Sequence, residues 1–332
     1  MNKKVLVLGG TGAMGVYLVP ELLKLGYSVD VVSLDKIESD NERLRYFVGN
    51  GEDKEYIASV LKNGYDGIVD FMIYKLPRFK EWYDMLLGSC EHYIYLSSYR
   101  VYANEEHPIK ETSPRLLDVS DDKSLIESED YSIYKAQGED VLRNSLYKNW
   151  TAIRPAITYS KRRFQLVTLE MNDNVGRALL GKKVLLPKGA HDIEGTMTWA
   201  GDVAKMIAAI LFNKKALCEV YTVSTSEHHT WGEIAEYYKE LCGMETVFID
   251  DEDYIALVGG RIENRRQLIY DREFDRIIDN SKILELSGLK QEDLMPLYEG
   301  LKLEIAGLCP EMFEKTSGAW GPMDEYIEKN KI

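Results

Sequence analysis

The sequence contains little cysteine and little histidine, and these residues are scattered. Four of the 332 residues are cysteines (Cys90, Cys218, Cys242 and Cys309), and no two of them form a C-x-x-C pair. The five histidines include one adjacent pair but no spacing typical of metal ligands. This pattern argues against a disulfide-stapled scaffold and against a zinc site. We therefore expect no metal, and ordinary free thiols in a reducing compartment.

The sequence also lacks an excess of positive charge and any long hydrophobic run. It has 41 Lys and Arg against 55 Asp and Glu, which gives a formal net charge of -14. Nucleic-acid-binding proteins usually present a basic face, so we expect no nucleic acid partner. The first apolar run, "VLVL", ends at glycines and is too short for a signal peptide. No stretch approaches the roughly 20 apolar residues of a membrane span. These absences predict a cytoplasmic protein with no membrane partner.

The first half of the chain alternates strand-like with helix-like segments. The expected strands are short β-branched or apolar runs at residues 4–10, 28–34, 44–49, 67–74, 92–98 and 150–155. The expected helices lie between them, at residues 15–26, 52–64, 77–90 and 131–147. Continuous apolar strands separated by helices are typical of a parallel sheet that is covered on both faces. The sequence therefore predicts an α/β fold with a doubly wound parallel sheet.

The second half is less regular. A helix is expected at 203–213, a strand at 219–225, a helix at 230–243, and further helices near 281–287 and 294–306. The region 103–130 is charged and weakly periodic, which predicts a long surface loop. Loops of that length in a compact domain are often functional.

A glycine-rich loop follows the first expected strand directly. In "GGTGAMG", Gly9, Gly12 and Gly15 have the spacing G-x-x-G-x-x-G and lead straight into a helix. Glycine at such positions permits a tight turn, close approach of the backbone to a pyrophosphate, and close packing of helix on strand. The phosphate charge then lies at the helix N-terminus. We expect this loop, with Thr11, Ala13 and Met14 between its glycines, to bind a dinucleotide; the alternative is a tight turn with no ligand.

The end of the second strand indicates which dinucleotide is bound. An acidic side chain there favours NAD, and a basic one favours NADP. The sequence reads "VVSLDK", in which Asp35 could bind the ribose diol, or Ser33 and Lys36 could hold a phosphate. Because Leu34 offers no guanidinium, we favour NAD, and NADP stays open.

A tyrosine and a lysine in "YSIYK" form the candidate proton-transfer pair. Lys135 lies four residues after Tyr131 and so on the same helix face, where its charge would stabilise the phenolate. Ser98, at the end of the strand in "YLSSYRVY", could hydrogen-bond the same substrate oxygen. Such a set suits an alcohol–ketone interconversion. The alternative is that Tyr131 packs in a core and Lys135 is a solvated charge. Tyr134, off the face of Lys135, is assigned to packing.

These motifs, in this order, resemble the extended short-chain dehydrogenases/reductases, the family of NAD-dependent epimerases and dehydratases. The resemblance covers most of residues 4–302 and is carried by "GGTGAMG", "YLSSYRVY", "YSIYKAQGE", "IRPAITY", "WAGDVAKMI", "DNSKILELSG" and "YEGL". It implies that Tyr131 is the acid/base, that Lys135 activates it and binds the ribose, and that Ser98 rather than Ser97 holds the substrate oxygen. It also places Asn50, Phe71, Met72 and Pro155 at the cofactor.

The resemblance further implies a domain division, a substrate class and an assembly. Residues 1–158 and about 193–226 would form a Rossmann-type cofactor domain, and about 159–192 with 227–332 a smaller α/β substrate-binding domain. A nucleotide-sugar diphosphate would need cationic donors, for which Lys75, Arg162, Arg163 and Arg261 are candidates. The alternative is that these are solvated surface charges. A homodimer is the expected assembly.

The predicted function is an NAD(P)-dependent epimerase or reductase that acts on a nucleotide sugar. The residues after Ser98 read "YRVY" and lack the acidic pair typical of the family's dehydratases, which disfavours dehydration. The alternative is a non-catalytic NAD(P)-binding regulatory or RNA-associated protein of the same fold. It comes from the resemblance of "IVDFMIYK" to a branch that includes chloroplast stem-loop RNA-binding proteins.

Overall fold

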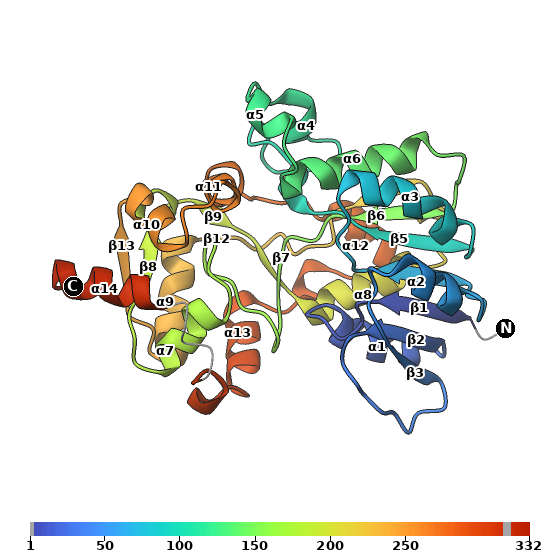
Figure 1. Cartoon of the computed structure of the whole chain (residues 1–332), viewed down its shortest axis with the longest axis horizontal. Helices are drawn as coiled ribbons and strands as arrows, with labels where there is room; N and C mark the ends of the chain where they lie inside the picture. Colours follow the sequence, from blue (N-terminus) through green and yellow to red (C-terminus); the bar gives the residue numbers. More distant parts are fainter. Residues whose placement is uncertain (1–2, 315–319) are drawn as a thin grey trace.

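Six strands from the first half of the chain and one from the second half build a seven-stranded parallel sheet (Figure 1). A computed structural model describes residues 3–314 and 320–332 of the chain. The strand order is β11-β6-β5-β4-β1-β2-β3, and every neighbouring pair is parallel. The strands are β1 (Lys4–Leu8), β2 (Ser28–Ser33), β3 (Leu44–Val48), β4 (Gly67–Asp70), β5 (His92–Leu96), β6 (Trp150–Ile153) and β11 (Glu219–Tyr221). The order 3-2-1-4-5-6 is that of a Rossmann sheet, so the predicted fold class is confirmed.

Helices cover both faces of this sheet because its strands are apolar on both faces. Val5 and Val7 of β1 pack in one buried cluster and Leu6 and Leu8 in another, as the period of two requires. The first cluster includes residues of α1 (Gly15–Lys24), α8 (Ala200–Ile210) and α12 (Ser281–Ser287). The second includes residues of α2 (Lys54–Leu61), α3 (Leu76–Leu87) and α6 (Tyr131–Asn144). The sheet is therefore doubly wound.

All seven strands of the sheet end earlier than the sequence suggested, and two of them show why. The run expected at 67–74 leaves the sheet after Asp70, because the Asp70 carboxylate accepts the backbone N–H of Met72 at 2.9 Å and turns the chain. The run expected at 150–155 ends at Ile153, two residues before Pro155, which has no N–H to donate. Because the strands are parallel, the carboxyl ends of β4 and β6 lie on the same side of the sheet as that of β1. The segments that follow them can therefore converge on the glycine loop.

The rest of the chain forms a second apolar core beside the sheet, at the left of Figure 1. Three two-stranded pairs contribute: β7 (Ile157–Tyr159) with β10 (Met197–Trp199), β8 (Val184–Pro187) with β13 (Thr246–Ile249), and β9 (Glu194–Gly195) with β12 (His229–Thr230). The helices are α7 (Arg177–Leu179), α9 (Trp231–Cys242), α10 (Asp251–Leu257), α11 (Ile262–Gln267), α13 (Leu297–Ile305) and α14 (Gly321–Asn330). The three short pairs escaped sequence prediction because their strands have two to four residues.

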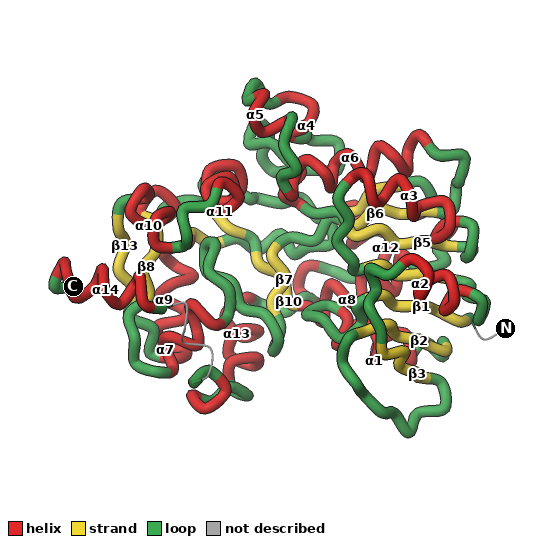
Figure 2. The backbone as a smooth tube through the Cα atoms, viewed as in Figure 1, coloured by secondary structure: helices red, strands yellow, loops and turns green. Residues whose placement is uncertain are grey.

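The region 103–130 is largely irregular, as predicted. Figure 2 shows it as a loop interrupted by two short helices, α4 (Leu116–Val119) and α5 (Lys123–Ile126). Leu116 and Leu125 are buried with Ile133 of α6, so the loop is tied to the helix that carries "YSIYK". None of the helices in the described part of the chain has the length and hydrophobicity of a membrane span.

Candidate functional site

The glycine loop packs so closely against the sheet that a side chain is excluded at several of its glycines. Gly9 has φ +76°, a conformation that favours glycine. A Cβ on Gly15 would lie 2.4 Å from the carbonyl carbon of Gly10, and one on Gly10 would lie 2.8 Å from Val31 Cγ1. The start of α1 is therefore pressed onto β1 and β2. This is the arrangement that brings backbone N–H groups to a pyrophosphate.

The N-terminus of α1 is chemically suited to an anion. The helix has ten residues, its first turn carries no acidic side chain, and Met14 at its start makes no side-chain cap. Val16 and Tyr17 already donate their N–H groups to the Gly12 and Met14 carbonyls, but no carboxylate of the first turn offsets the helix dipole at this end. Together with the close packing at Gly9, Gly10 and Gly15, these features show that the residues present fit the diphosphate of a dinucleotide cofactor.

Substituting Gly15 tests whether this close packing matters. We expect Gly15→Ala to lower the free energy of unfolding by about 1–3 kcal/mol, because the added Cβ overlaps backbone atoms that cannot rotate away. Nicotinamide cofactor binding should weaken as well. Gly321→Ala is the matched control, since a Cβ there meets no atom within 4 Å. Thermal unfolding and cofactor titration would measure both effects, and equal behaviour of the two variants would contradict the expectation.

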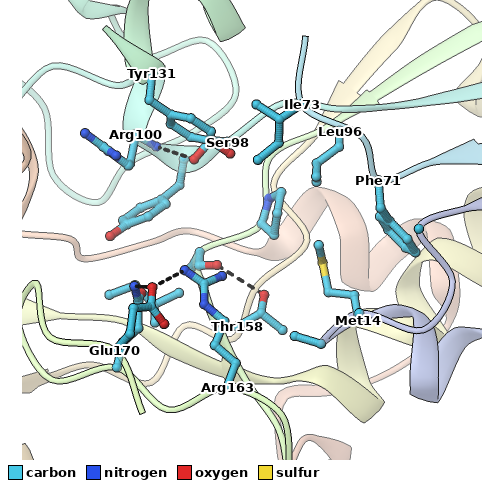
Figure 3. Close-up of a pocket in the computed structure, with 18 of the residues that line it drawn as sticks. Met14, Phe71, Ile73, Leu96, Ser98, Arg100, Tyr131, Thr158, Arg163 and Glu170 are labelled. Carbon is cyan, nitrogen blue, oxygen red and sulfur yellow. Dashed lines mark hydrogen bonds and ion pairs between the residues drawn. The ribbon is translucent and has the colours of Figure 1, made fainter. Parts of the chain in front are cut away.

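A cavity of about 480 Å³ joins the glycine loop to the residues of the predicted proton-transfer set. Figure 3 shows Ser98 and Tyr131 on one side of it, Arg163 and Glu170 on another, and Met14 and Phe71 at the end near the loop. Ten of the predicted site residues line it: Gly9, Gly12, Ala13, Met14, Gly15, Phe71, Ser98, Tyr131, Pro155 and Arg163. Segments far apart in the sequence therefore meet at the carboxyl end of the sheet, where ligands bind in open α/β folds.

Tyr131 is the first residue of α6, and Ser98 follows the end of β5. Burial raises the pKa of Tyr131, while the positive charges of Arg100 and Arg163 and a hydrogen bond with Ser98 act in the opposite direction. The guanidinium carbon of Arg100 lies 5.1 Å from the centre of the Tyr131 ring. Tyr131 is therefore a protonated phenol in the ligand-free protein, placed among groups that favour its ionisation.

Lys135 lies deeper than Tyr131, beneath the cavity. Its Nζ is 5.6 Å from the centre of the Tyr131 ring and donates a 2.6 Å hydrogen bond to the Leu96 carbonyl. Burial lowers the pKa of Lys135 to about 7, although Asp70 and Glu139 act to raise it. In the ligand-free protein, the positively charged side chains that lower the pKa of Tyr131 are those of Arg100 and Arg163. The activating role predicted for Lys135 stays a prediction.

Glu139 fixes α6 against the ends of two strands. Its buried carboxylate accepts hydrogen bonds from Arg154 Nε at 2.8 Å and Nη2 at 2.6 Å, and from Ser97 Oγ at 2.6 Å. Ser97 follows β5 and Arg154 follows β6. Because Lys135 lies one turn before Glu139 on the same helix, this anchor also sets the positions of Tyr131 and Lys135. Ser97 is thus engaged in the anchor, which leaves Ser98 for the cavity.

Tyr134 packs as predicted. Its side chain is buried, and its ring makes an edge contact with the Tyr131 ring at 5.4 Å between centres. Burial raises its pKa.

A second cavity, of about 780 Å³, lies on the other side of the glycine loop. It is lined by Thr11, Gly12 and Ala13 of the loop, by Asp35, and by Lys161 and Arg162 from the segment after β7. Arg162 and Arg163, which the sequence grouped as substrate ligands, therefore face different cavities. The reason is local: Lys161 and Arg162 form the tip of a tight turn, whose ends Ser160 and Arg163 exchange two backbone hydrogen bonds, so the chain reverses between the two arginines.

The remaining predicted residues lie at varied distances from these cavities. Ser33 is buried at the end of β2, with its hydroxyl 2.6 Å from that of Thr11. Met72 packs against Gly9 and Gly51, and the Asn50 side chain accepts the backbone N–H of Glu52. Lys75 and Arg261 are exposed and line neither cavity; Lys75 pairs with Glu129. For those two, the structure favours the alternative of solvated surface charge.

The sequence analysis missed a buried cluster of arginines at the edge of the first cavity. Arg272 is fully buried, donates to Tyr99 Oη and to the Val167 carbonyl, each at 2.6 Å, and lines the cavity. Asp271 is in ion-pair contact with Arg272, with Arg276 Nε at 3.2 Å and with Arg100 Nε at 3.3 Å. Arg100 also lies 4.0 Å from Asp130, so three guanidinium groups meet two carboxylates and leave a net positive charge beside the cavity. Arg100, two residues after Ser98, could have been noticed; Arg272 carried no local signal.

Comparison with known proteins relates this site to a known fold. No family model matches the chain. The chloroplast stem-loop binding protein of 41 kDa b from Arabidopsis thaliana is 24% identical over 250 residues, which cover 71% of this chain and 62% of that protein. The chain thus matches less than two thirds of this relative's length.

Solved structures are similar over nearly the whole chain. An epimerase from Methanothermobacter thermautotrophicus superposes with a TM-score of 0.69 at 16% identity, over 99% of this chain and 95% of the other. The UDP-glucose 4-epimerase of Thermotoga maritima, solved with UDP-glucose, gives 0.66 at 21% identity, over 94% and 99%. The dTDP-glucose 4,6-dehydratase of Bacillus anthracis, solved with NAD, gives 0.68 at 18% identity, over 96% and 99%. The chain therefore has the fold of the extended short-chain dehydrogenases/reductases, as its motifs predicted.

Proposed function

We propose that this protein is an NAD(P)-dependent epimerase or reductase that acts on a nucleotide sugar, with Tyr131 as the acid/base. One observation supports this most directly: a single cavity of about 480 Å³ is lined both by the glycine loop and by Ser98 and Tyr131. The glycine loop and the start of α1 would hold the cofactor diphosphate. When bound, the nicotinamide ring supplies hydride acceptance and donation.

The side chains at the cavity would handle the proton of a substrate hydroxyl. Tyr131 Oη takes that proton as the carbon is oxidised and returns it on reduction, while Ser98 Oγ hydrogen-bonds the same substrate oxygen. Arg100 and Arg163 stabilise the phenolate that forms. Lys135, whose Nζ donates to the carbonyl of the cavity residue Leu96, would contact the cofactor ribose.

A nucleotide diphosphate is the substrate group that best fits the opposite wall. Arg163 and Arg272 both line the cavity, Arg163 in an exposed pair with Glu170 at 3.3 Å, and diphosphate oxygens are good partners for guanidinium groups. The similar Thermotoga maritima structure was solved with UDP-glucose, which is consistent with this class. We accordingly propose residues 1–158 and about 193–226 as the cofactor domain, and about 159–192 with 227–332 as the substrate domain.

The proposal is tested by assaying the purified chain against UDP- and dTDP-sugars. Conversion of a sugar, followed by chromatography and by absorbance of the reduced nicotinamide, supports it. Tightly copurified NAD would favour an epimerase, and exchangeable NADPH a reductase. Failure to bind any nicotinamide dinucleotide would refute the proposal.

The pH dependence of the reaction should respond to Arg100. Because Arg100 lowers the pKa of Tyr131, Arg100→Gln should raise that pKa. The oxidation step needs ionised Tyr131, so the rise of kcat/KM with pH should move to higher pH in the variant. Lys75→Gln, which alters an exposed charge, should leave the profile in place. An unshifted profile in Arg100→Gln would contradict the assigned role.

A second candidate function is RNA association. It rests on the partial match to the chloroplast stem-loop binding protein. The net charge of -14 opposes it, because nucleic-acid affinity depends largely on neutralised phosphates. Fluorescence anisotropy with a labelled RNA stem-loop at physiological salt separates the candidates. Submicromolar binding without sugar conversion would favour the second one.

A further inference from the structure

The second cavity places two cations at the ribose side of the glycine loop. Thr11, Gly12 and Ala13 form one wall, Asp35 lies beyond the end of β2, and Lys161 and Arg162 come from the segment after β7. Gly12 and Ala13 line both cavities. A dinucleotide whose diphosphate lies on this loop would therefore have one end towards Tyr131 and its adenosine end towards Arg162.

The end of β2 offers no carboxylate for the adenosine ribose. NAD-binding sites commonly place an acidic residue there, which hydrogen-bonds the ribose 2′-hydroxyl and repels a 2′-phosphate. In this chain the strand ends at Ser33, whose hydroxyl lies 2.6 Å from that of Thr11 and accepts the backbone N–H of Asp35 at 3.0 Å. Ser33 thus fixes the loop to the strand end and leaves room beside the ribose.

The nearest carboxylate is Asp35, and it is already paired with a cation. Its Oδ2 lies 3.7 Å from Arg162 Nη1, and both side chains are about half exposed, at 49% and 50%. Exposed ion pairs of this kind are weak, so Arg162 can exchange Asp35 for a stronger anion at little cost.

The other acidic group of the cavity, Glu304, is engaged elsewhere. Its carboxylate accepts Trp199 Nε1 at 2.6 Å and the Tyr17 hydroxyl. The charged side chains of this cavity that can contact a ligand are therefore two cations, Lys161 and Arg162, and one anion, Asp35.

We propose that Lys161 and Arg162 select NADP(H) over NAD(H) by holding the 2′-phosphate of its adenosine ribose. A guanidinium binds phosphate oxygens through two parallel hydrogen bonds, and the neighbouring ammonium adds a point charge. This inference rests on the proposed function and specifies its cofactor. It reverses the preference for NAD that the sequence suggested, because the missing guanidinium is supplied from the far side of the cavity and not from the strand end.

The test is isothermal titration of the full chain with NADPH, NADH, 2′,5′-ADP and 5′-AMP. The wild type should bind NADPH and 2′,5′-ADP about 10- to 100-fold more tightly than their partners without the phosphate, which is the range for one or two charge-assisted hydrogen bonds. Lys161→Ala/Arg162→Ala should remove that difference and leave NADH and 5′-AMP within about threefold of wild type.

Two further variants test whether Arg162 acts through its charge at this cavity. Asp35→Asn should strengthen NADPH binding, because it removes both the competitor for Arg162 and a repulsive charge. Arg261→Ala, an exposed arginine that lines neither cavity, should change nothing. Thermal unfolding checks that each variant folds. If the double variant does not fold, the single variant Arg162→Ala is titrated in its place.

The outcomes separate this inference from the proposed function. Equal or tighter binding of NADH by the wild type overturns the inference alone. The inference is also overturned if the Lys161/Arg162 variant loses affinity for NADPH and NADH equally. That result would indicate contacts to the diphosphate that both dinucleotides share. If neither dinucleotide binds, the proposed function fails and the inference with it.

Discussion

Tyr131→Phe should reduce kcat/KM for the nucleotide-sugar reaction by about 10²- to 10⁴-fold, the usual contribution of a positioned general acid/base. The substitution removes one oxygen from the cavity and keeps the ring, with its contacts to Arg100 and Tyr134. The loss should therefore fall on the chemical step. Binding of the nicotinamide cofactor should stay close to that of the wild type, as should the melting temperature.

Tyr134→Phe is the matched control for this prediction. Tyr134 lies in the same helix turn, is buried, and has its pKa raised by burial, so it should stay protonated and take no part in proton transfer. Its substitution should leave kcat/KM within a few-fold of the wild type. The assignment of Tyr131 as acid/base is wrong if Tyr131→Phe retains full activity. If Tyr134→Phe loses activity instead, Tyr134 is the acid/base.

Glu139→Ala should lower the free energy of unfolding by about 3–5 kcal/mol, the range for breaking a buried ion pair from one side. Arg154 is 1% exposed and makes two of its hydrogen bonds to Glu139, so the variant buries a guanidinium without its counter-charge. Ser97 loses its acceptor as well. Because this anchor orients α6, activity should fall together with stability.

Urea denaturation measures this effect, and Glu129→Ala is its control. Glu129 is exposed and pairs with Lys75 on the surface, so its removal should change stability by at most about 1 kcal/mol. Equal destabilisation by both substitutions would contradict the anchoring role of Glu139.

The stabilisation by Glu139 should also depend on pH. Burial acts to raise the pKa of Glu139, but the charge and hydrogen bonds of Arg154 outweigh it and the pKa is lowered. A carboxyl whose folded-state pKa is depressed stabilises the fold above its unfolded pKa of about 4.3 and loses that effect as the pH falls through the folded value. The difference between the wild type and Glu139→Ala should therefore shrink in acid.

Local patterns sufficed where function depends on residues close in sequence. The glycine spacing after β1 specified a tight loop before a helix, and the structure contains that loop with no room for a Cβ at Gly10 or Gly15. The spacing from Tyr131 to Lys135 specified one helix turn. The continuous apolar strands separated by helices specified a sheet that is covered on both sides, and the two buried clusters around β1 agree with it. In each case residues that are close together in the sequence carry the information.

Contacts between distant segments could not be predicted in this way. Arg272 lies beside Tyr99, and Arg162 beside Asp35, only because the chain after β7 folds back over the sheet edge. The sequence grouped Arg162 with Arg163, and the structure places them in different cavities. The strand pairs β8–β13 and β9–β12 are likewise too short to leave a periodic signal.

The sequence by itself determined the α/β fold, the glycine loop and the helix that carries Tyr131 and Lys135, because each is set by the spacing of neighbouring residues along one element. Only the tertiary structure decided which charges surround Tyr131 and which cations line the second cavity. Those charges come from Arg100, Arg163 and Arg162, and electrostatic contact depends on distance in space, which folding sets independently of distance along the chain.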